Sequence, residues 1–266
     1  MTFSVSVLSS GSRGNALYVE SDKTRFLIDA GLSGKKMESL LASIQREAKD
    51  LDAIFVTHEH SDHIQGVGVL SRRYHIPVYA NEKTWEGMEA KRIGDLDDGC
   101  RCVMKKDTMM TLGDLDIESF GVSHDARDAQ FYQIHHEGKR FVTLTDTGYC
   151  SERLQDRLKN ANMYLIESNH DVSMLRMGSY SWSLKQRILS DVGHLSNEDS
   201  ASVMQHMLGN DTRHIYLGHR SQENNLKPLA HQVMQDALED IGIGVGSEVL
   251  LHDTEEGEAT PLTKVV

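Results

Sequence analysis

Residues 57–63 read Thr57-His58-Glu59-His60-Ser61-Asp62-His63 and directly follow the apolar run Ala53-Ile54-Phe55-Val56. The apolar run predicts a buried strand, so the polar residues lie at its carboxyl end. His58 and His60 are two residues apart, and from an extended turn both can reach one metal ion. Asp62 and His63 can face a second ion as a helix begins. Imidazole and carboxylate suit zinc, manganese or iron, so the stretch predicts a metal site rather than a solvated turn.

The sequence on either side of this stretch predicts strands alternating with helices. Strand patterns cover residues 3–8, 15–21, 24–29, 52–57, 76–80, 162–167, 213–218 and 248–252, with several more strands before 146. Helical spacing covers residues 33–46, 62–74, 82–92, 173–190, 196–207 and 225–241. This mixture predicts a layered α/β (α+β) protein with two packed sheets and helices outside. No linker or repeat interrupts the chain, so we expect a single domain over 1–266.

Composition limits the class of protein further. The 266 residues are 39% hydrophobic and contain no apolar run long enough to cross a membrane. The first residues lack the features of a secretory signal, and three cysteines make a disulfide framework improbable, which together indicate a reducing cytoplasm. A net charge of −12 argues against a passive DNA-binding module, although bound metal ions can supply positive charge locally.

The spacing His-x-His-x-Asp-His after a strand resembles the signature of the metallo-β-lactamase superfamily. Other markers follow in the expected order: Leu27-Ile28-Asp29-Ala30-Gly31, Gly121-Val122-Ser123-His124, Leu144-Thr145-Asp146-Thr147-Gly148 and Leu217-Gly218-His219. Taken singly, His124 also fits a turn, Asp146 a turn cap and His219 a surface position. Together the resemblance implies an αββα sandwich of two mixed sheets flanked by helices, with a metal site at its edge.

The resemblance also implies a complete ligand set for two divalent ions (Zn, Mn or Fe). The first ion would be held by His58, His60 and His124, and the second by Asp62, His63 and His219, with Asp146 bridging. Asp29 would not bind a metal ion itself but would hold a ligating side chain in position. A hydroxide between two such ions would be the nucleophile, because the ions lower the pKa of the water that they bind.

The branch of the superfamily depends on other residues. Class B β-lactamases commonly have cysteine where this chain has Asp146, and Cys150 comes four residues too late. Too few residues follow His219 for a glyoxalase-type helical domain, and the chain between Asp146 and His219 is too short for a β-CASP insertion. The segments over 9–15, 167–171, 193–197 and 217–225 instead resemble the WalJ/YycJ family, which is related to tRNase Z and the phosphodiesterase PhnP.

That resemblance implies a cytoplasmic 5′→3′ DNA exonuclease with a link to mismatch repair, whose partner is a nucleic acid and not a membrane. His194 resembles the general-acid histidine of tRNase Z, so Asp62 and His194 are the candidate catalytic residues. Ser12 and Asn15 lie in a loop that can contact phosphate, and His170 follows a strand close by in sequence. The alternatives are a capping loop for His194, a plain turn for the 9–15 loop, which fits equally well, and a strand end for His170, which is the simpler interpretation.

Two other functions remain open from the sequence. An acyl hydrolase for thioesters or lactams could use the same dinuclear site, and a metal-binding module without activity is the third possibility. Residues 71–106 carry a net charge of +2, which fits either a lip that steers nucleic acid or a solvated helix face. Tyr180 and Trp182 could stack on bases, although core packing is the simpler interpretation. The sequence does not predict the oligomeric state.

Overall fold

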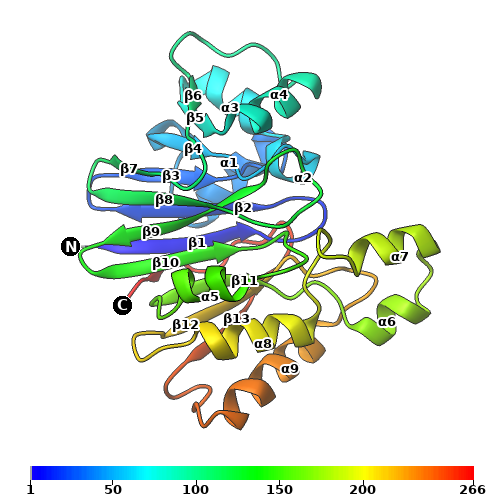
Figure 1. Ribbon diagram of the computed structural model, residues 1–266. Coiled ribbons are helices and arrows are strands. Elements are labelled where there is room, and N and C mark those ends of the chain that lie inside the picture. Colours follow the sequence, from blue (N-terminus) through cyan, green and yellow to red (C-terminus); the bar gives the residue numbers. More distant parts are fainter. Residues whose placement is uncertain (1) are drawn as a thin grey trace. The chain divides into compact units, whose positions relative to one another are not determined.

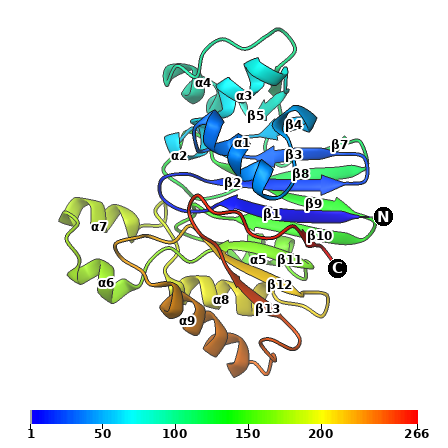
Figure 2. The ribbon, with the colours of Figure 1, turned by 180° about the vertical axis from the view of Figure 1, so that it is seen from behind.

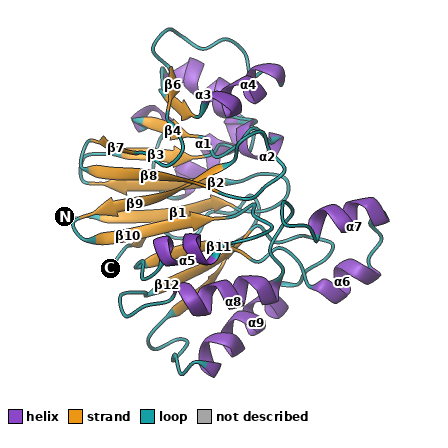
Figure 3. Ribbon diagram, in the orientation of Figure 1, coloured by secondary structure: helices purple, strands orange, loops and turns teal. Residues whose placement is uncertain are grey.

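The computed structural model describes residues 2–266, which form two mixed seven-stranded sheets flanked by helices (Figures 1 and 3). The first sheet has the order β14 (Thr263–Lys264), β1 (Phe3–Ser9), β2 (Ala16–Ser21), β3 (Arg25–Ile28), β4 (Ala53–Phe55), β5 (Val78–Ala80) and β6 (Arg101–Val103). The second has the order β13 (Leu250–Asp253), β12 (His214–Gly218), β11 (Met163–Glu167), β10 (Lys139–Leu144), β9 (Gln130–His136), β8 (Leu115–Gly121) and β7 (Met109–Leu112). The predicted fold class is confirmed.

The chain divides into two compact units. Unit 1 contains residues 1–121, 126–136 and 254–265, and unit 2 contains residues 122–125, 137–253 and 266. The helices of unit 1 are α1 (Gly34–Ser43), the short 3₁₀ helix η1 (Ala48–Asp50), α2 (Ser61–Ile64), α3 (Val67–Tyr74) and α4 (Glu82–Ala90). Those of unit 2 are α5 (Glu152–Leu158), α6 (Val172–Met177), α7 (Trp182–Ile188), α8 (Asn197–Met207) and α9 (Lys227–Asp240).

In unit 1 the first sheet has a different partner on each face. Leu27, Ile54 and Val78 belong to a buried cluster with side chains of α1, α3 and α4, which therefore cover one face. On the other face the ring of Phe55 meets Tyr132 of β9 edge-on, with centroids 5.5 Å apart. This packing of helices, sheet and second sheet matches the layered arrangement expected from the sequence. At the edge of the sheet, β14 pairs with β1. Figure 2 shows the C-terminal segment, in red, running beside β1.

The parallel strands of each unit bring chemically active residues to one edge. In unit 1, β3 and β4 are parallel, and Asp29 and the 57–63 stretch follow their carboxyl ends. In unit 2, β10, β11 and β12 are parallel, so Asp146, Glu167 and His219 come at the corresponding ends. Carboxyl ends of parallel strands are the usual location of binding sites in such sheets, because their loops are free to carry functional side chains.

Several predicted elements differ from the observed ones. The expected helix over 62–74 is two helices, because the backbone N–H of Gly66 donates to the carbonyl of Ala30 at 2.7 Å and so leaves the helical pattern. The expected helix over 173–190 is also split, with Gly178 extended and Ser181 capping α7. Helix α5 and strand β14 were not predicted. The core interpretation of Trp182 is wrong, because the residue is 67% exposed.

Candidate metal centre

The 57–63 stretch of unit 1 gathers three imidazoles. The ring centroid of His58 lies 4.6 Å from that of His60 and 4.1 Å from that of His63. Helix α2 begins at Ser61 and therefore holds Asp62 and His63 in its first turn. The predicted change from an extended turn to a helix is present, and it concentrates the four candidate ligands of this unit.

Asp29 holds this group from the neighbouring strand. One of its oxygens lies 2.7 Å from Nδ1 of His63, and both oxygens accept hydrogen bonds from Thr57 at 2.8 Å. The hydroxyl of Thr57 lies 3.0 Å from Nδ1 of His58. Burial raises the pKa of Asp29, against the lowering effect of these hydrogen bonds. Because both rings are engaged through Nδ1, their Nε2 atoms are the ones oriented for a metal ion, as in other metal sites. The role of Thr57 in orienting these rings was not predicted from the sequence.

Asn15 and Gly31 fit closely against the start of α2. The side-chain amide of Asn15 lies 3.3 Å from an Asp62 oxygen and 3.1 Å from Nε2 of His63, and its backbone N–H donates to the carbonyl of Asp62 at 2.7 Å. A Cβ added to Gly31 would lie 1.6 Å from that same carbonyl oxygen. Only glycine therefore allows the two segments to approach this closely. Ser12, in the same loop as Asn15, is exposed.

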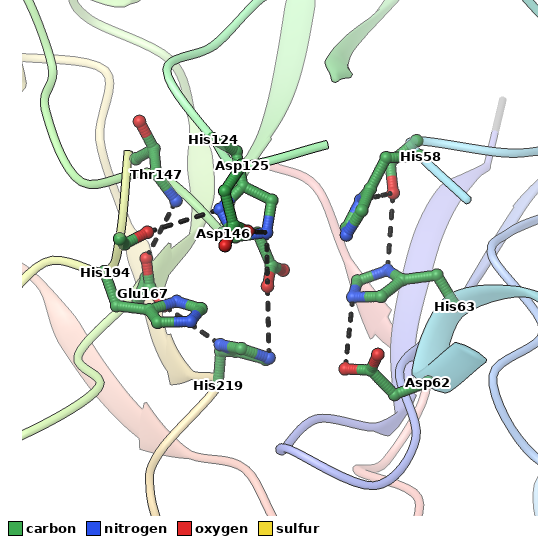
Figure 4. Close-up of polar contacts among 12 residues, drawn as sticks. His58, Asp62, His63, His124, Asp125, Asp146, Thr147, Glu167, His194 and His219 are labelled. Carbon is green, nitrogen blue, oxygen red and sulfur yellow. Dashed lines mark hydrogen bonds and ion pairs between the residues drawn. The ribbon is translucent and has the colours of Figure 1, made fainter. Parts of the chain in front are cut away.

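In unit 2, two histidines face one carboxylate (Figure 4). Oδ1 of Asp146 lies 3.3 Å from Nε2 of His219 and 3.9 Å from Nε2 of His124. Nδ1 of His124 donates to the carbonyl of Gly193 at 3.3 Å, which again turns Nε2 toward the carboxylate. The three side chains are almost entirely buried. Asp146 is thus the shared neighbour of two imidazoles, the arrangement that a bridging ligand requires.

Glu167 is a residue that sequence analysis missed as a member of the site. It is fully buried, and its Oε1 lies 2.7 Å from Nδ1 of His194 and 2.9 Å from Nδ1 of His219. Its Oε2 accepts hydrogen bonds from the backbone N–H groups of Thr147 and Leu195. Burial alone would raise the pKa of Glu167, but the two imidazoles outweigh burial and hold it below its ordinary value. Its signal in the sequence was a lone acidic residue at the end of an apolar strand.

The candidate catalytic His194 lies just before α8. Ser196 caps that helix by accepting from the N–H of Asp199 at 3.0 Å, so His194 stays outside the helix, as predicted. Its ring centroid lies 5.1 Å from that of His219 and 5.3 Å from that of His124. His170, by contrast, is 1% exposed, which confines it to supporting the loops around it.

The group of residues in unit 2 fits a divalent cation. Asp146, Glu167, His194 and His219 each offer one ligand atom, and these four atoms lie within 4.8 Å of one another. Nδ1 of His219 donates its hydrogen bond to Glu167, so the lone pair of Nε2 points toward the Asp146 oxygen. A cation between Nε2 and this oxygen would relieve the repulsion between the two atoms. Imidazole and carboxylate donors without a thiolate match zinc, manganese and iron.

Comparison with known proteins identifies the class. A model described as "Beta-lactamase superfamily domain" matches residues 24–219. The solved structure of the metallo-beta-lactamase fold protein YhfI from Bacillus subtilis aligns with a TM-score of 0.73 at 15% identity, covering 98% of this chain and 99% of that one. The short form of human tRNase Z aligns at 0.64 and 16% identity, covering 98% and 99%. The chain is a metal-dependent hydrolase of the β-lactamase superfamily.

Two curated relatives define the branch. "Exodeoxyribonuclease WalJ" of Streptococcus pneumoniae serotype 2 is 56% identical over 99% of this chain and 98% of its own length. "Exodeoxyribonuclease YycJ" of Bacillus anthracis is 49% identical over 98% of both chains. The chain therefore belongs to the WalJ/YycJ family, as the resemblance of its loops implied. Within residues 2–266, no helix is long and apolar enough to cross a membrane.

Proposed function

We propose that this protein is a metal-dependent DNA exonuclease that removes nucleotides in the 5′→3′ direction, acts in the cytoplasm and contributes to mismatch repair. The names of its full-length relatives support DNA as the substrate. The observation that carries the proposal is the contact of Nδ1 of His194 with Glu167, the carboxylate that also holds His219. This contact fixes the orientation of the His194 ring beside His219, a candidate ligand, and a proton donor requires such a fixed orientation.

The proposed ligands are those predicted from the sequence: His58, His60 and His124 for one ion, Asp62, His63 and His219 for the other, and Asp146 for both. The family match over 24–219 includes all seven, which supports treating residues 1–266 as one functional domain. When bound, two divalent cations would supply a bridging hydroxide as nucleophile and positive charge for the leaving oxygen.

The remaining residues would transfer a proton, position the attacking water, support the ligands and contact the substrate. His194 protonates the departing alkoxide oxygen, a step worth about 10²- to 10⁴-fold in rate. Asp62, whose side chain is 23% exposed, holds the attacking water in position. Asp29, Asn15 and His170 keep ligands in place, while the exposed Ser12 contacts the substrate.

Cleavage of labelled nucleic acid tests this function. Metal-stripped protein is reloaded with manganese or zinc and given single- and double-stranded DNA and RNA with a label at either end. We expect metal-dependent release of 5′ nucleotides from DNA, weakened in His194→Ala. Turnover of a thioester or lactam without cleavage of any polymer would replace the nuclease with the acyl hydrolase. Loss of label from the 3′ end alone would reverse the direction of digestion.

A further inference from the structure

Unit 1 contains a groove of about 660 Å³ with Asp62 in its wall. Its lining comes from three separate segments: the loop between β1 and β2, helices α2 and α3, and the turn after α4 (Figure 2). A volume of this size lies in the range of sites for nucleotide-sized ligands. Because Asp62 is a proposed ligand, whatever occupies the groove adjoins the proposed reaction centre.

Four cationic side chains line this groove: Arg13, Arg72, Lys91 and Arg92. Asp62 is the acidic residue among its lining residues, and Glu256 pairs with Arg13 from outside the lining. Positive charge still exceeds negative charge here, in a chain whose net charge is −12. Such a protein repels a polyanion in general and needs a local concentration of cations to bind one. The charge of the groove is therefore complementary to phosphate.

Two of the four cations are fixed by the fold. Nε of Arg13 lies 2.8 Å from a carboxylate oxygen of Glu256, and Nη1 of Arg72 donates to the carbonyl of Ile93 at 2.8 Å. The other two, Lys91 and Arg92, are exposed. Arg92 has a φ of +57° and follows the C-cap of α4, where a left-handed residue commonly ends a helix.

The groove also offers apolar surface. Ile64 is buried, Ile93 is partly buried and Val69 is 38% exposed, and all three belong to the lining. Cations beside apolar side chains match a single nucleic-acid strand, whose phosphates and bases need the two kinds of contact together. A free phosphate ion would use only the cations.

We propose that this groove binds the backbone of one DNA strand next to the phosphodiester that is cleaved, with Lys91 and Arg92 neutralising phosphates and the accessible Val69 and Ile93 contacting sugar or base. The proposal rests on the nuclease function and adds the path of the strand. It also gives a role to part of the positive charge of residues 71–106, because three of its cations, Arg72, Lys91 and Arg92, line the groove.

A charge-matched pair of variants tests the groove. Lys91→Gln/Arg92→Asn removes two cations from it, and asparagine tolerates the positive φ at position 92. Lys83→Gln/Lys105→Gln removes two exposed cations from the same region outside the lining. Binding of a fluorescent 12-nucleotide single strand is measured by anisotropy in EDTA, where no cleavage interferes, at several salt concentrations. Thermal unfolding checks that both variants fold.

We expect the groove variant to bind more weakly and its slope of log affinity against log salt to become shallower by about 1.4, since each lost phosphate contact contributes about 0.7. The control variant should retain the wild-type slope. Equal losses in both variants, an unchanged groove variant, or no binding by the wild type would each overturn the proposal. A wild type that binds the strand through the groove but cleaves nothing when reloaded with metal would sink the nuclease function alone.

Discussion

Oε1 of Glu167 lies 2.9 Å from Nδ1 of His219, on the side of the ring opposite the nitrogen that faces Asp146. The carboxylate therefore sets the tautomer and the direction of the ring. The same oxygen contacts His194, so one buried residue positions both a proposed ligand and the proposed proton donor. Loss of Glu167 should therefore affect both histidines, whereas loss of either histidine should affect one role alone.

Replacing Glu167 by glutamine should lower metal affinity and activity by about 10- to 100-fold, the usual effect of losing a carboxylate behind a ligating histidine. Metal content after dialysis and kcat measure the two effects. Glu118→Gln is the control, because Glu118 also contacts a histidine, His135, at 3.1 Å but lies on β8 away from the candidate ligands. Equal losses in both variants would show a general effect of removing a carboxylate.

His194→Ala and His219→Ala should differ in kind. Removing a proton donor lowers kcat by about 10²- to 10⁴-fold but leaves the metal bound. Removing a ligand lowers the amount of bound metal. Elemental analysis of each purified variant, together with its kcat, separates the roles. Loss of metal in His194→Ala would make His194 a ligand instead.

Gly31→Ala should damage the site without touching any proposed ligand. The added methyl group would overlap the carbonyl of Asp62, and overpacking of this kind costs about 1–3 kcal/mol. Denaturant unfolding and metal content measure the loss. In Gly34→Ala the new methyl meets a valine methyl group at 2.9 Å at the start of α1, where the side chain can move, so the loss should be smaller.

Stability should fall in acid because of His170. Burial lowers its pKa to about 4 from the ordinary 6.5, so the ring is neutral in both folded and unfolded chains above pH 6.5. As the pH falls from 6.5 toward 4, the unfolded chain binds the proton first, and stability worth up to roughly 3 kcal/mol is lost. Unfolding free energies at pH 7 and 4.5 should show a smaller difference in His170→Gln than in the wild type. The exposed His206→Gln should behave like the wild type.

The sequence predicts the part of the site that is local. An apolar strand followed by four candidate donors is recognisable because strand and donors are contiguous, and the order of the later motifs then locates His124, Asp146 and His219. The two-sheet class follows from alternating strands and helices. The roles of these histidines and aspartates as metal ligands stay predictions.

What the sequence could not predict depends on contacts between distant segments. Glu167 gains its importance from His194 and His219, which come 27 and 52 residues later. The break at Gly66 comes from a hydrogen bond to Ala30, which helical periodicity does not report. The exposure of Trp182, at the first residue of α7, is likewise not indicated by its residue type, which favours the core.

Asp29, Asp146 and His219 all adopt positive φ, at 62°, 48° and 51°. Left-handed backbone is tolerated by aspartate, asparagine, histidine and glycine and strongly disfavoured for β-branched residues. The backbone at these strand ends therefore selects among side chains before any metal chemistry does. Saturation mutagenesis at the three positions should recover stable variants mainly from that short set, so the choice of donor atoms open to evolution here is narrower than metal coordination alone would permit.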